Sequence, residues 1–269
     1  MKSGHATYVY PMTTIVVIVV GWELAARLGY VPRYILPSPT GIAVRFYELH
    51  VLILQESLFT LQATLLGFVL SVVIGVPLGL ALVSWRGFNR AVYPLLIGSQ
   101  VVPKVALAPL FLVWFGFGLL SKVLITFLVA FFPVLIAAVV GLQATEIEKI
   151  HVARAAGANQ LQLFWLVRLP HALPVIFGGM KVSITLAIVG ALVREFVASE
   201  HGVGKLLLSA SGNMDTELLF AGIFALVIIG VALFLLMEVA ERLALPWHIS
   251  QRASSQSSTS SERRTHHEG

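Results

Sequence analysis

Long apolar stretches separated by shorter polar segments dominate the pattern along this chain. Six such stretches cover residues 12–28, 57–84, 91–116, 123–142, 173–197 and 218–243. A helix crosses a bilayer with about 20 apolar residues, whereas a transmembrane strand takes about 10 residues in strict alternation. The continuous stretches therefore predict an all-α membrane protein with six transmembrane helices, and they disfavour a β-barrel.

Composition agrees with a membrane protein. The chain is 58% hydrophobic and 12% charged, and its mean hydropathy is +0.90, whereas about 25% of the residues in a soluble domain are charged. The net charge of +5 comes from cations scattered among loops, so we expect the lipid bilayer and no nucleic acid as a partner. The absence of cysteine excludes disulfides and cysteine-based metal sites.

The two ends of the chain are predicted to lie outside the membrane domain, which spans residues 12–249. The stretch 12–28 has the length of a signal peptide or of a short span, and we favour a retained span because no small-x-small cleavage motif follows it. Residues 1–11 then form a short N-terminal segment, and the Ser-rich residues 250–269 form a disordered tail. Between the first two spans, residues 30–54 predict a loop followed by an interfacial helix.

Small residues recur every four positions in the second stretch, at Gly67, Ser71, Gly75 and Gly79. This spacing places them on one face of a helix, where small side chains allow a second helix to approach closely. Packing within the chain and packing against a second subunit are the two interpretations, and we favour the first.

The third stretch contains Pro103, Lys104 and Pro109. Proline removes a backbone donor and clashes with the preceding turn, so a straight helix is not expected. Lys104 lies roughly 20 Å along the helix from Arg90 at 1.5 Å per residue, too deep to face lipid. Either a broken helix lines a translocation pathway at Pro103 and Lys104, or Lys104 is paired within the helix bundle.

A polar segment, residues 143–172, separates the fourth and fifth stretches. A helix can begin at Thr145 or Glu146 and end or kink at Gly157, and residues 161–167 form a second helical piece before Leu169 and Pro170. Two short helices joined at a glycine suggest a docking element for a partner, with a simple connecting loop as the alternative.

The distribution of Lys and Arg orients the predicted spans. With both termini in the cytoplasm, ten of these residues lie inside and six outside, leaving Lys104 and Lys181 in the membrane. The excess of positive charge on the inside favours this orientation and places the polar segment in the cytoplasm. Lys181 is interpreted as a membrane anchor that reaches the interface by snorkelling.

Two further charged features lie at the end of the fifth stretch and just after it. Arg194 and Glu195 are predicted either to line the pathway or contact a partner, or to act as interfacial anchors. The string Gly202-Val203-Gly204-Lys205 resembles a P-loop but lacks the first glycine and the final Ser or Thr, so we interpret it as a flexible turn. No metal-binding spacing or catalytic motif is found, so the chain is not expected to be an enzyme.

The polar segment resembles the cytoplasmic loop of membrane permeases of bacterial ABC importers, which carries the pattern EAA, then Gly, then I-x-L-P. Ala153 matches the second Ala, Gly157 the Gly, and Val167 to Pro170 the end of the motif, while His151 and Val152 replace the Glu and the first Ala. The resemblance extends from the LPSP string at residues 36–39 to GALVREFVASEHGVGKLL near residues 190–207, and is closest to the nitrate, sulfonate and taurine importers.

This resemblance implies a permease subunit in the bacterial inner membrane with a cytoplasmic coupling helix between spans 4 and 5. The implied partners are two ATPase subunits, an extracytoplasmic substrate-binding protein and a second permease copy. ATP and Mg²⁺ would be used by the ATPase, and the chain itself would bind no cofactor and no metal. The implied coupling residues are Ala153, Arg154, Ala156, Gly157, Ala158, Phe164, Trp165, Leu169 and Pro170.

The substrate implied by the resemblance is a small organic solute: a nitrate-, sulfonate- or taurine-like anion, an aromatic acid, or a vitamin precursor such as a thiamine pyrimidine. By their resemblance to that group of permeases, the strings GNMDTELLFAG and AERLALPWH favour the vitamin precursors. The rival class, a membrane-integral enzyme or a stand-alone channel, needs a catalytic cluster or a polar pore stripe, and the sequence shows neither.

Overall fold

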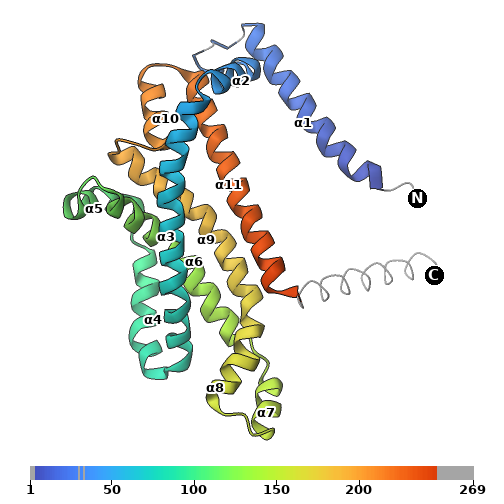
Figure 1. Cartoon of the computed structure of the whole chain (residues 1–269), viewed down its shortest axis with the longest axis vertical. Coiled ribbons are helices and arrows are strands. Elements are labelled where there is room, and N and C mark those ends of the chain that lie inside the picture. Colours follow the sequence, from blue (N-terminus) through green and yellow to red (C-terminus); the bar gives the residue numbers. More distant parts are fainter. Residues whose placement is uncertain (1–3, 30, 33, 247–269) are drawn as a thin grey trace. The chain divides into compact units, whose positions relative to one another are not determined.

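The computed structural model describes residues 4–29, 31–32 and 34–246, and every regular element in these ranges is a helix (Figure 1). The predicted tail, 250–269, lies outside the described residues. The helices are α1 Gly4–Arg27, α2 Pro39–Glu48, α3 His50–Ser84, α4 Arg86–Gln100, α5 Ala108–Phe115, α6 Leu119–Gln143, α7 Ile147–Ala155, α8 Gln160–Leu163, α9 Leu169–Val197, α10 Val203–Gly212 and α11 Thr216–Ala244. A 3₁₀ helix, Lys104–Leu107, precedes α5, and a π-helix, Phe164–Arg168, joins α8 to α9.

Four helical segments in the described ranges are long and apolar enough to cross a membrane by length and composition. They are α3, α6, the continuous segment Gln160–Val197, and α11. The number rises to five if α4 and the helical segment Lys104–Phe115, which meet at an angle of 88°, count as one span. The break at Pro103 confirms that the third stretch is not a straight helix. The fold class is therefore all-α with several membrane-length helices, while the total of six spans stays a prediction.

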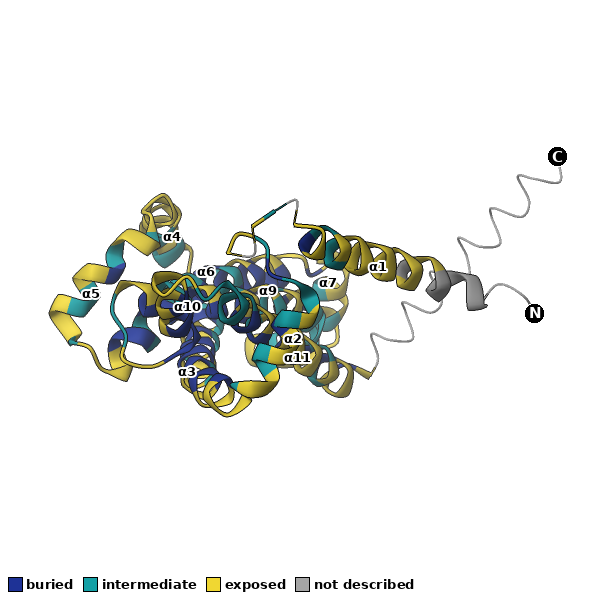
Figure 2. Ribbon diagram, turned by 90° about the horizontal axis from the view of Figure 1, so that it is seen from above, coloured by how far each residue is buried: buried dark blue, intermediate teal, exposed yellow. Residues whose placement is uncertain are grey.

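Several helix boundaries differ from the predicted ones, because a helix can continue past the end of the apolar stretch from which it was predicted. The first helix begins at Gly4, eight residues before the predicted start of its span, and most of it is exposed (Figure 2). The predicted interfacial helix is α2, which ends at Glu48, so that Ile53 belongs to α3. The interruption at Leu49 is a single apolar residue, and a hydropathy pattern does not register it.

The fourth predicted span also begins earlier. Its helix, α6, starts at Leu119, four residues before the predicted start at residue 123, and Lys122 is buried within it. The turn before α6 is confined to Gly116, which has a φ of +74°, and to the two residues after it. Lys122, one of the six cations counted outside the membrane, therefore lies in a helix and is buried.

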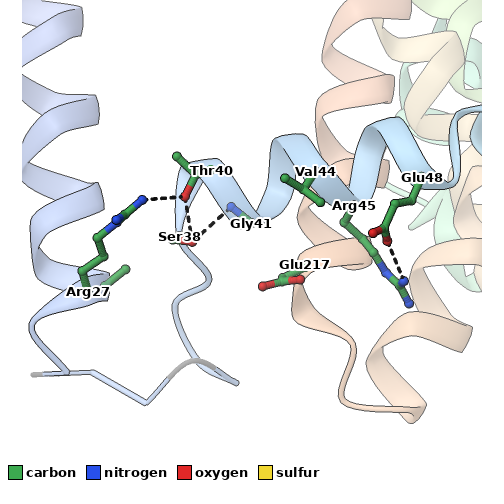
Figure 3. Close-up of a pocket in the computed structure, with 9 residues that line it drawn as sticks. Arg27, Ser38, Thr40, Gly41, Val44, Arg45, Glu48 and Glu217 are labelled. Atoms are coloured by element: carbon green, nitrogen blue, oxygen red, sulfur yellow. Dashed lines mark hydrogen bonds and ion pairs between the residues drawn. The ribbon is translucent and has the colours of Figure 1, made fainter.

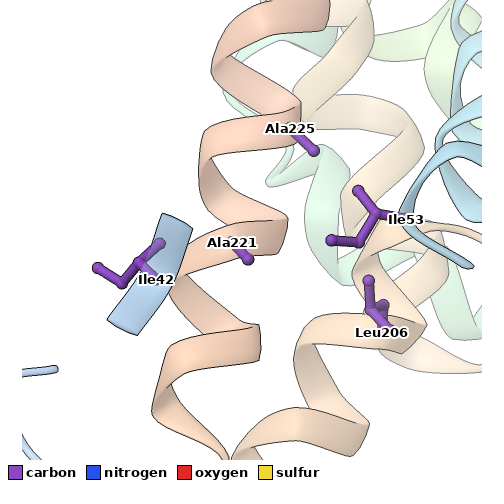
Figure 4. Close-up of a cluster of buried hydrophobic side chains, with 5 residues drawn as sticks. All are labelled: Ile42, Ile53, Leu206, Ala221 and Ala225. Carbon is purple, nitrogen blue, oxygen red and sulfur yellow. The ribbon is translucent and has the colours of Figure 1, made fainter. Parts of the chain in front are cut away.

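The chain forms two compact units. Unit 1 comprises the described residues up to Gln62 together with Leu192–Ile229, and unit 2 comprises Ala63–Ala191 and the described residues from Gly230 on. The core of unit 1 joins α2, α3, α10 and α11 through five buried residues (Figure 4): Ile42, Ile53, Leu206, Ala221 and Ala225.

In unit 2 the small residues of α3 pack against α6. A Cβ atom added at Gly67 would lie 2.4 Å from Cγ2 of Thr126, and one at Gly79 would lie 2.7 Å from Cβ of Ala138. Ser71 donates from Oγ to the Phe127 carbonyl over 3.2 Å. The small residues on this face of α3 therefore bring two helices of the same chain into close contact.

We expect Gly67→Ala to destabilise the protein by about 1 to 3 kcal/mol, because the new methyl group overlaps the stiff β-branched side chain of Thr126. Gly98→Ala is the matched control, since nothing lies within 4 Å of a Cβ there and alanine is the better helix former. Thermal unfolding in detergent measures both. A Gly67→Ala midpoint at or above that of the unsubstituted protein would contradict the packing.

Candidate functional site

The polar segment between α6 and α9 begins with α7, whose C-terminus is closed by a Schellman motif. Ala158 N–H donates to the Ala153 carbonyl over 3.0 Å, and Gly157 N–H donates to the Arg154 carbonyl over 2.9 Å. Gly157 has a φ of +84°, the left-handed conformation that glycine adopts without strain. The helix α7 thus ends at Gly157 because glycine adopts this left-handed conformation easily.

A capping box restarts the helix two residues after Gly157. The side-chain oxygen of Asn159 accepts from Gln162 N–H over 2.8 Å, and the side-chain oxygen of Gln162 accepts from Asn159 N–H over 2.9 Å. We did not predict this cap, although the spacing Asn-x-x-Gln is itself the signal for it. The two caps fix both sides of the turn at residues 156–159.

The second helical piece does not end at Leu169 and Pro170 as we predicted. It continues into α9 as one segment of 38 residues, Gln160–Val197. The change to π-helical bonding explains why: Leu169 N–H donates to the Phe164 carbonyl, five residues earlier, just before Pro170, which has no N–H to donate. The two motif residues are therefore the first residues of α9. Two helices do meet at Gly157, but the prediction that the second one is short and ends before Leu169 was wrong.

The aromatic pair of the segment points in two directions. Phe164 packs against a buried cluster formed by Ala138, Leu142, Ala172 and Ile176. Trp165 contacts Phe164 edge to face, with 5.3 Å between ring centroids, and is itself 58% exposed. Phe164 thus attaches the segment to α6 and α9, while the indole is left open to a partner.

In unit 1, the N-terminus of α10 is capped by side chains from α3 and α9. Gly202 N–H donates to Glu56 over 2.5 Å, Val203 N–H donates to the Thr60 hydroxyl over 2.9 Å, and Gly204 N–H donates to Glu195 over 2.8 Å. The Thr60 hydroxyl in turn donates to the Glu195 carboxylate over 2.9 Å. Three of the four free N–H groups at this helix start are satisfied, and two carboxylates face its positive end.

This arrangement corrects two of our interpretations. Arg194 and Glu195 are 0% and 1% exposed, so they are buried in protein and are not interfacial anchors. The string at Gly202 is not a simple turn, because it forms the start of α10. Glycine is required at Gly202, where φ is +122° and an added Cβ would lie 2.1 Å from the Glu195 carboxylate. A signal for this cap was present in the sequence: a carboxylate, Glu195, near the end of a long apolar helix, followed by two glycines two residues apart.

A polar cavity of about 470 Å³ lies elsewhere in unit 1, between α1, α2 and the start of α11. Figure 3 shows its lining, which includes Arg27, Thr40, Arg45, Glu48 and Glu217. Arg45 pairs with Asp215 at 2.6 Å. This hydrogen bond, and then the one to Glu48, raise the pKa of Arg45 above its usual value.

The partner of Arg45 caps α11. Asp215 accepts from Leu218 N–H over 3.0 Å, at the third position of the helix. Burial raises the pKa of Asp215, but the hydrogen bonds from Arg45 and Leu218 outweigh burial, so the pKa lies below its usual value. The carboxylate is therefore charged near neutral pH and ties α2 to the start of α11.

Two lysines that the sequence places in the membrane lie in unit 2. Lys181 on α9 pairs with Glu238 and Glu241 of α11, and its side chain is 14% exposed. It is consequently a half-buried ion-pair partner within the chain, and our interpretation of it as a snorkelling anchor was wrong. Lys104, half-buried after the break at Pro103, places Nζ 4.3 Å from the centroid of the Phe132 ring.

Comparison with known proteins identifies the family. Residues 61–246 match the family described as binding-protein-dependent transport system inner membrane component. The chain is 41% identical to the riboflavin transport system permease protein RibX of Chloroflexus aurantiacus, covering 88% of this chain and 89% of that protein. It is 35% identical to the formylaminopyrimidine transport permease protein ThiX of Halalkalibacterium halodurans, covering 90% and 96%. The chain belongs to this family of transport permeases.

A solved structure supports the same fold. The chain resembles one from inward-facing conformations of the MetNI methionine ABC transporter, with a TM-score of 0.57 and 20% identity. The match covers 70% of this chain and 92% of that chain. This likeness concerns the fold alone.

Proposed function

We propose that the chain is the permease subunit of an ATP-driven importer and that residues 146–170 couple it to cytoplasmic ATPase subunits. The observation that carries this proposal is the exposed apolar surface at the family motif. Val152 on α7 is 71% exposed, and Trp165 and Leu166 on the π-helix are 58% and 73% exposed. Apolar side chains clustered on a polar segment outside the lipid are typical of a protein interface.

The local structure supports a mechanical role for this segment. Two caps define the turn around Gly157, and Phe164 and Leu163 are packed into the chain. A coupling element must be rigidly joined to the helices that it moves, because ATP binding can shift the permease only through a differential contact with its two states. The continuous segment Gln160–Val197 provides that join.

The membrane arrangement that we propose has six spans and both termini in the cytoplasm, with α1 and the bent pair α4–α5 completing the four long helices. The exposed apolar residues of α1, such as Ile15 and Ile18, require lipid or a partner around them. The functional unit is a pair of identical permease chains with two ATPase subunits. An extracytoplasmic binding protein docks at the charged rim of the polar cavity beside Arg45.

The translocation pathway is proposed to run past the break at Pro103. Lys104 is half-buried above the Phe132 ring, which gives a cation and an aromatic face at the same place. This pair suits a planar solute that carries oxygen acceptors or negative charge. Arg194 and Glu195, the other two predicted pathway residues, are fully buried in unit 1.

The substrate we propose is a nitrogen heterocycle of the vitamin or vitamin-precursor kind. The relatives at 41% and 35% identity are named for transport of riboflavin and formylaminopyrimidine, whereas the putative aliphatic sulfonates permease SsuC of Bacillus subtilis is 34% identical and the taurine permease TauC of Escherichia coli is 28% identical. ATP hydrolysis belongs to the separate ATPase subunits in this proposal, and Mg²⁺ acts there with ATP.

Co-expression with the neighbouring ATPase and binding-protein genes tests the importer. We expect the ATPase to co-purify with the detergent-solubilised permease, and proteoliposomes to take up a labelled pyrimidine or flavin only with ATP inside and binding protein outside. A Trp165→Glu, Leu166→Glu variant, which charges the exposed surface, should lose the ATPase. Leu243→Glu, also at a strongly exposed leucine, is the control. An ATPase that never co-purifies with the unsubstituted chain would refute the proposal.

A further inference from the structure

A second cavity, of about 720 Å³, lies within unit 2 between the end of α3 and the segment formed by α8 and the π-helix. It falls in the size range of small-molecule sites. Its walls are mainly apolar and include Leu80, Ala81, Trp85, Leu161, Phe164 and Arg168. The transport functions for which the relatives are named do not assign a ligand to this cavity.

Arg168 gives the cavity its chemical character. It is the one charged residue among the described residues that line the cavity. Its Nε atom is buried and has no hydrogen-bond partner within the described part of the chain. A buried donor without an acceptor costs free energy, and a guanidinium group binds phosphate especially well. The cavity therefore combines an apolar floor with an anion-binding group.

We propose that this cavity binds an anionic phospholipid of the cytoplasmic leaflet. The phosphate contacts Arg168, and one acyl chain lies against Leu80 and Ala81. Trp85, 67% exposed at the junction of α3 and α4, stands where an interfacial tryptophan is expected. Arg86 follows it directly and adds positive charge on the side of the membrane that carries anionic lipids. The choice of leaflet rests on the orientation in the proposed function.

Fluorescence quenching of Trp85 by brominated lipids tests the site directly. The full transporter is reconstituted with trace brominated phosphatidylglycerol or brominated phosphatidylcholine in a phosphatidylcholine background. The difference between the native chain and Trp85→Phe isolates the emission of Trp85. One cation near the surface favours an anionic lipid by about fivefold, so we expect phosphatidylglycerol to quench Trp85 at about one fifth of the concentration that phosphatidylcholine needs.

Three variants separate the site from general membrane charge. Arg168→Gln should remove the preference for phosphatidylglycerol, while Arg90→Gln, which deletes an exposed cation outside the lining, should keep it. Ala81→Phe, which narrows the cavity from the α3 side, should reduce quenching by both lipids and leaves the arginine in place.

Several outcomes overturn the proposal. Equal quenching by the two lipids in the native chain, or an unchanged preference in Arg168→Gln, would do so. Quenching that inorganic phosphate abolishes at millimolar concentration would show a site for a free anion instead. The measurement needs neither ATP nor substrate, so its failure is distinguishable from a failure of the proposed transport function.

Discussion

Gly157→Pro should abolish uptake while the chain still inserts into the membrane. Proline fixes φ near −65°, whereas Gly157 has a φ of +84° and donates its N–H to the Arg154 carbonyl. Proline also disfavours the near-helical conformation of Ala156, the residue before it. The turn must open, which displaces the exposed face of α7 from the π-helix that follows it.

Gly157→Asn is the matched control for this prediction. Asparagine tolerates the left-handed conformation, and nothing lies within 4 Å of a Cβ at this position. We expect Gly157→Asn to retain most of the uptake and Gly157→Pro to fall to background, measured in proteoliposomes at matched amounts of inserted protein. Equal uptake by the two variants would show that the turn has no coupling role.

Glu195→Ala should be the most destabilising single change in unit 1. It removes the acceptor for Gly204 N–H and for the Thr60 hydroxyl, and it removes a negative charge close to the buried guanidinium of Arg194. Each buried donor left without its acceptor costs about 1 to 3 kcal/mol. Glu200→Ala makes the same change at an exposed site nearby, and we expect about 0.5 kcal/mol or less.

A double-mutant cycle with Gly202 makes this prediction specific. The three atoms nearest to an added Cβ at Gly202 all belong to the Glu195 carboxylate. Gly202→Ala alone should therefore destabilise strongly, and the double variant with Glu195→Ala should lose less than the sum by about 1 kcal/mol or more. Thermal or denaturant unfolding in detergent gives the four values. If the two single losses in the free energy of unfolding simply add in the double variant, the contact between these two residues is refuted.

The sequence predicted the helical class, the bend at Pro103 and the end of a helix near Gly157, because each depends on a local property such as apolar length, a missing N–H or a positive φ. It failed where distant residues meet. The buried carboxylate of Glu195 accepts hydrogen bonds from Gly204 N–H and from the Thr60 hydroxyl, and these donors surround it only after α10 has formed. The pairing of Lys181 likewise depends on α11, far along the chain.

Pro170 shows a different limit. Proline is favoured in the first turn of a helix and disfavoured in its interior, so the sequence suggested that one helix ends before Pro170 and another begins there. The change to π-helical bonding accommodates it within one continuous segment, and no residue between Phe164 and Arg168 signals that change. The Asn159 to Gln162 capping box, in contrast, was legible in the sequence and should have placed the helix start correctly.

The glycines at the start of α10 explain why this stretch looked like a nucleotide-binding loop at all. Both arrangements need successive backbone N–H groups that converge on an anion, with glycine where the anion comes closest. Here the anion is internal: the carboxylates of Glu56 and Glu195 take the positions that phosphate oxygens would take. The segment is a self-liganded nest, in which the protein's own side chains already accept from three of the four free N–H groups that a phosphate would need.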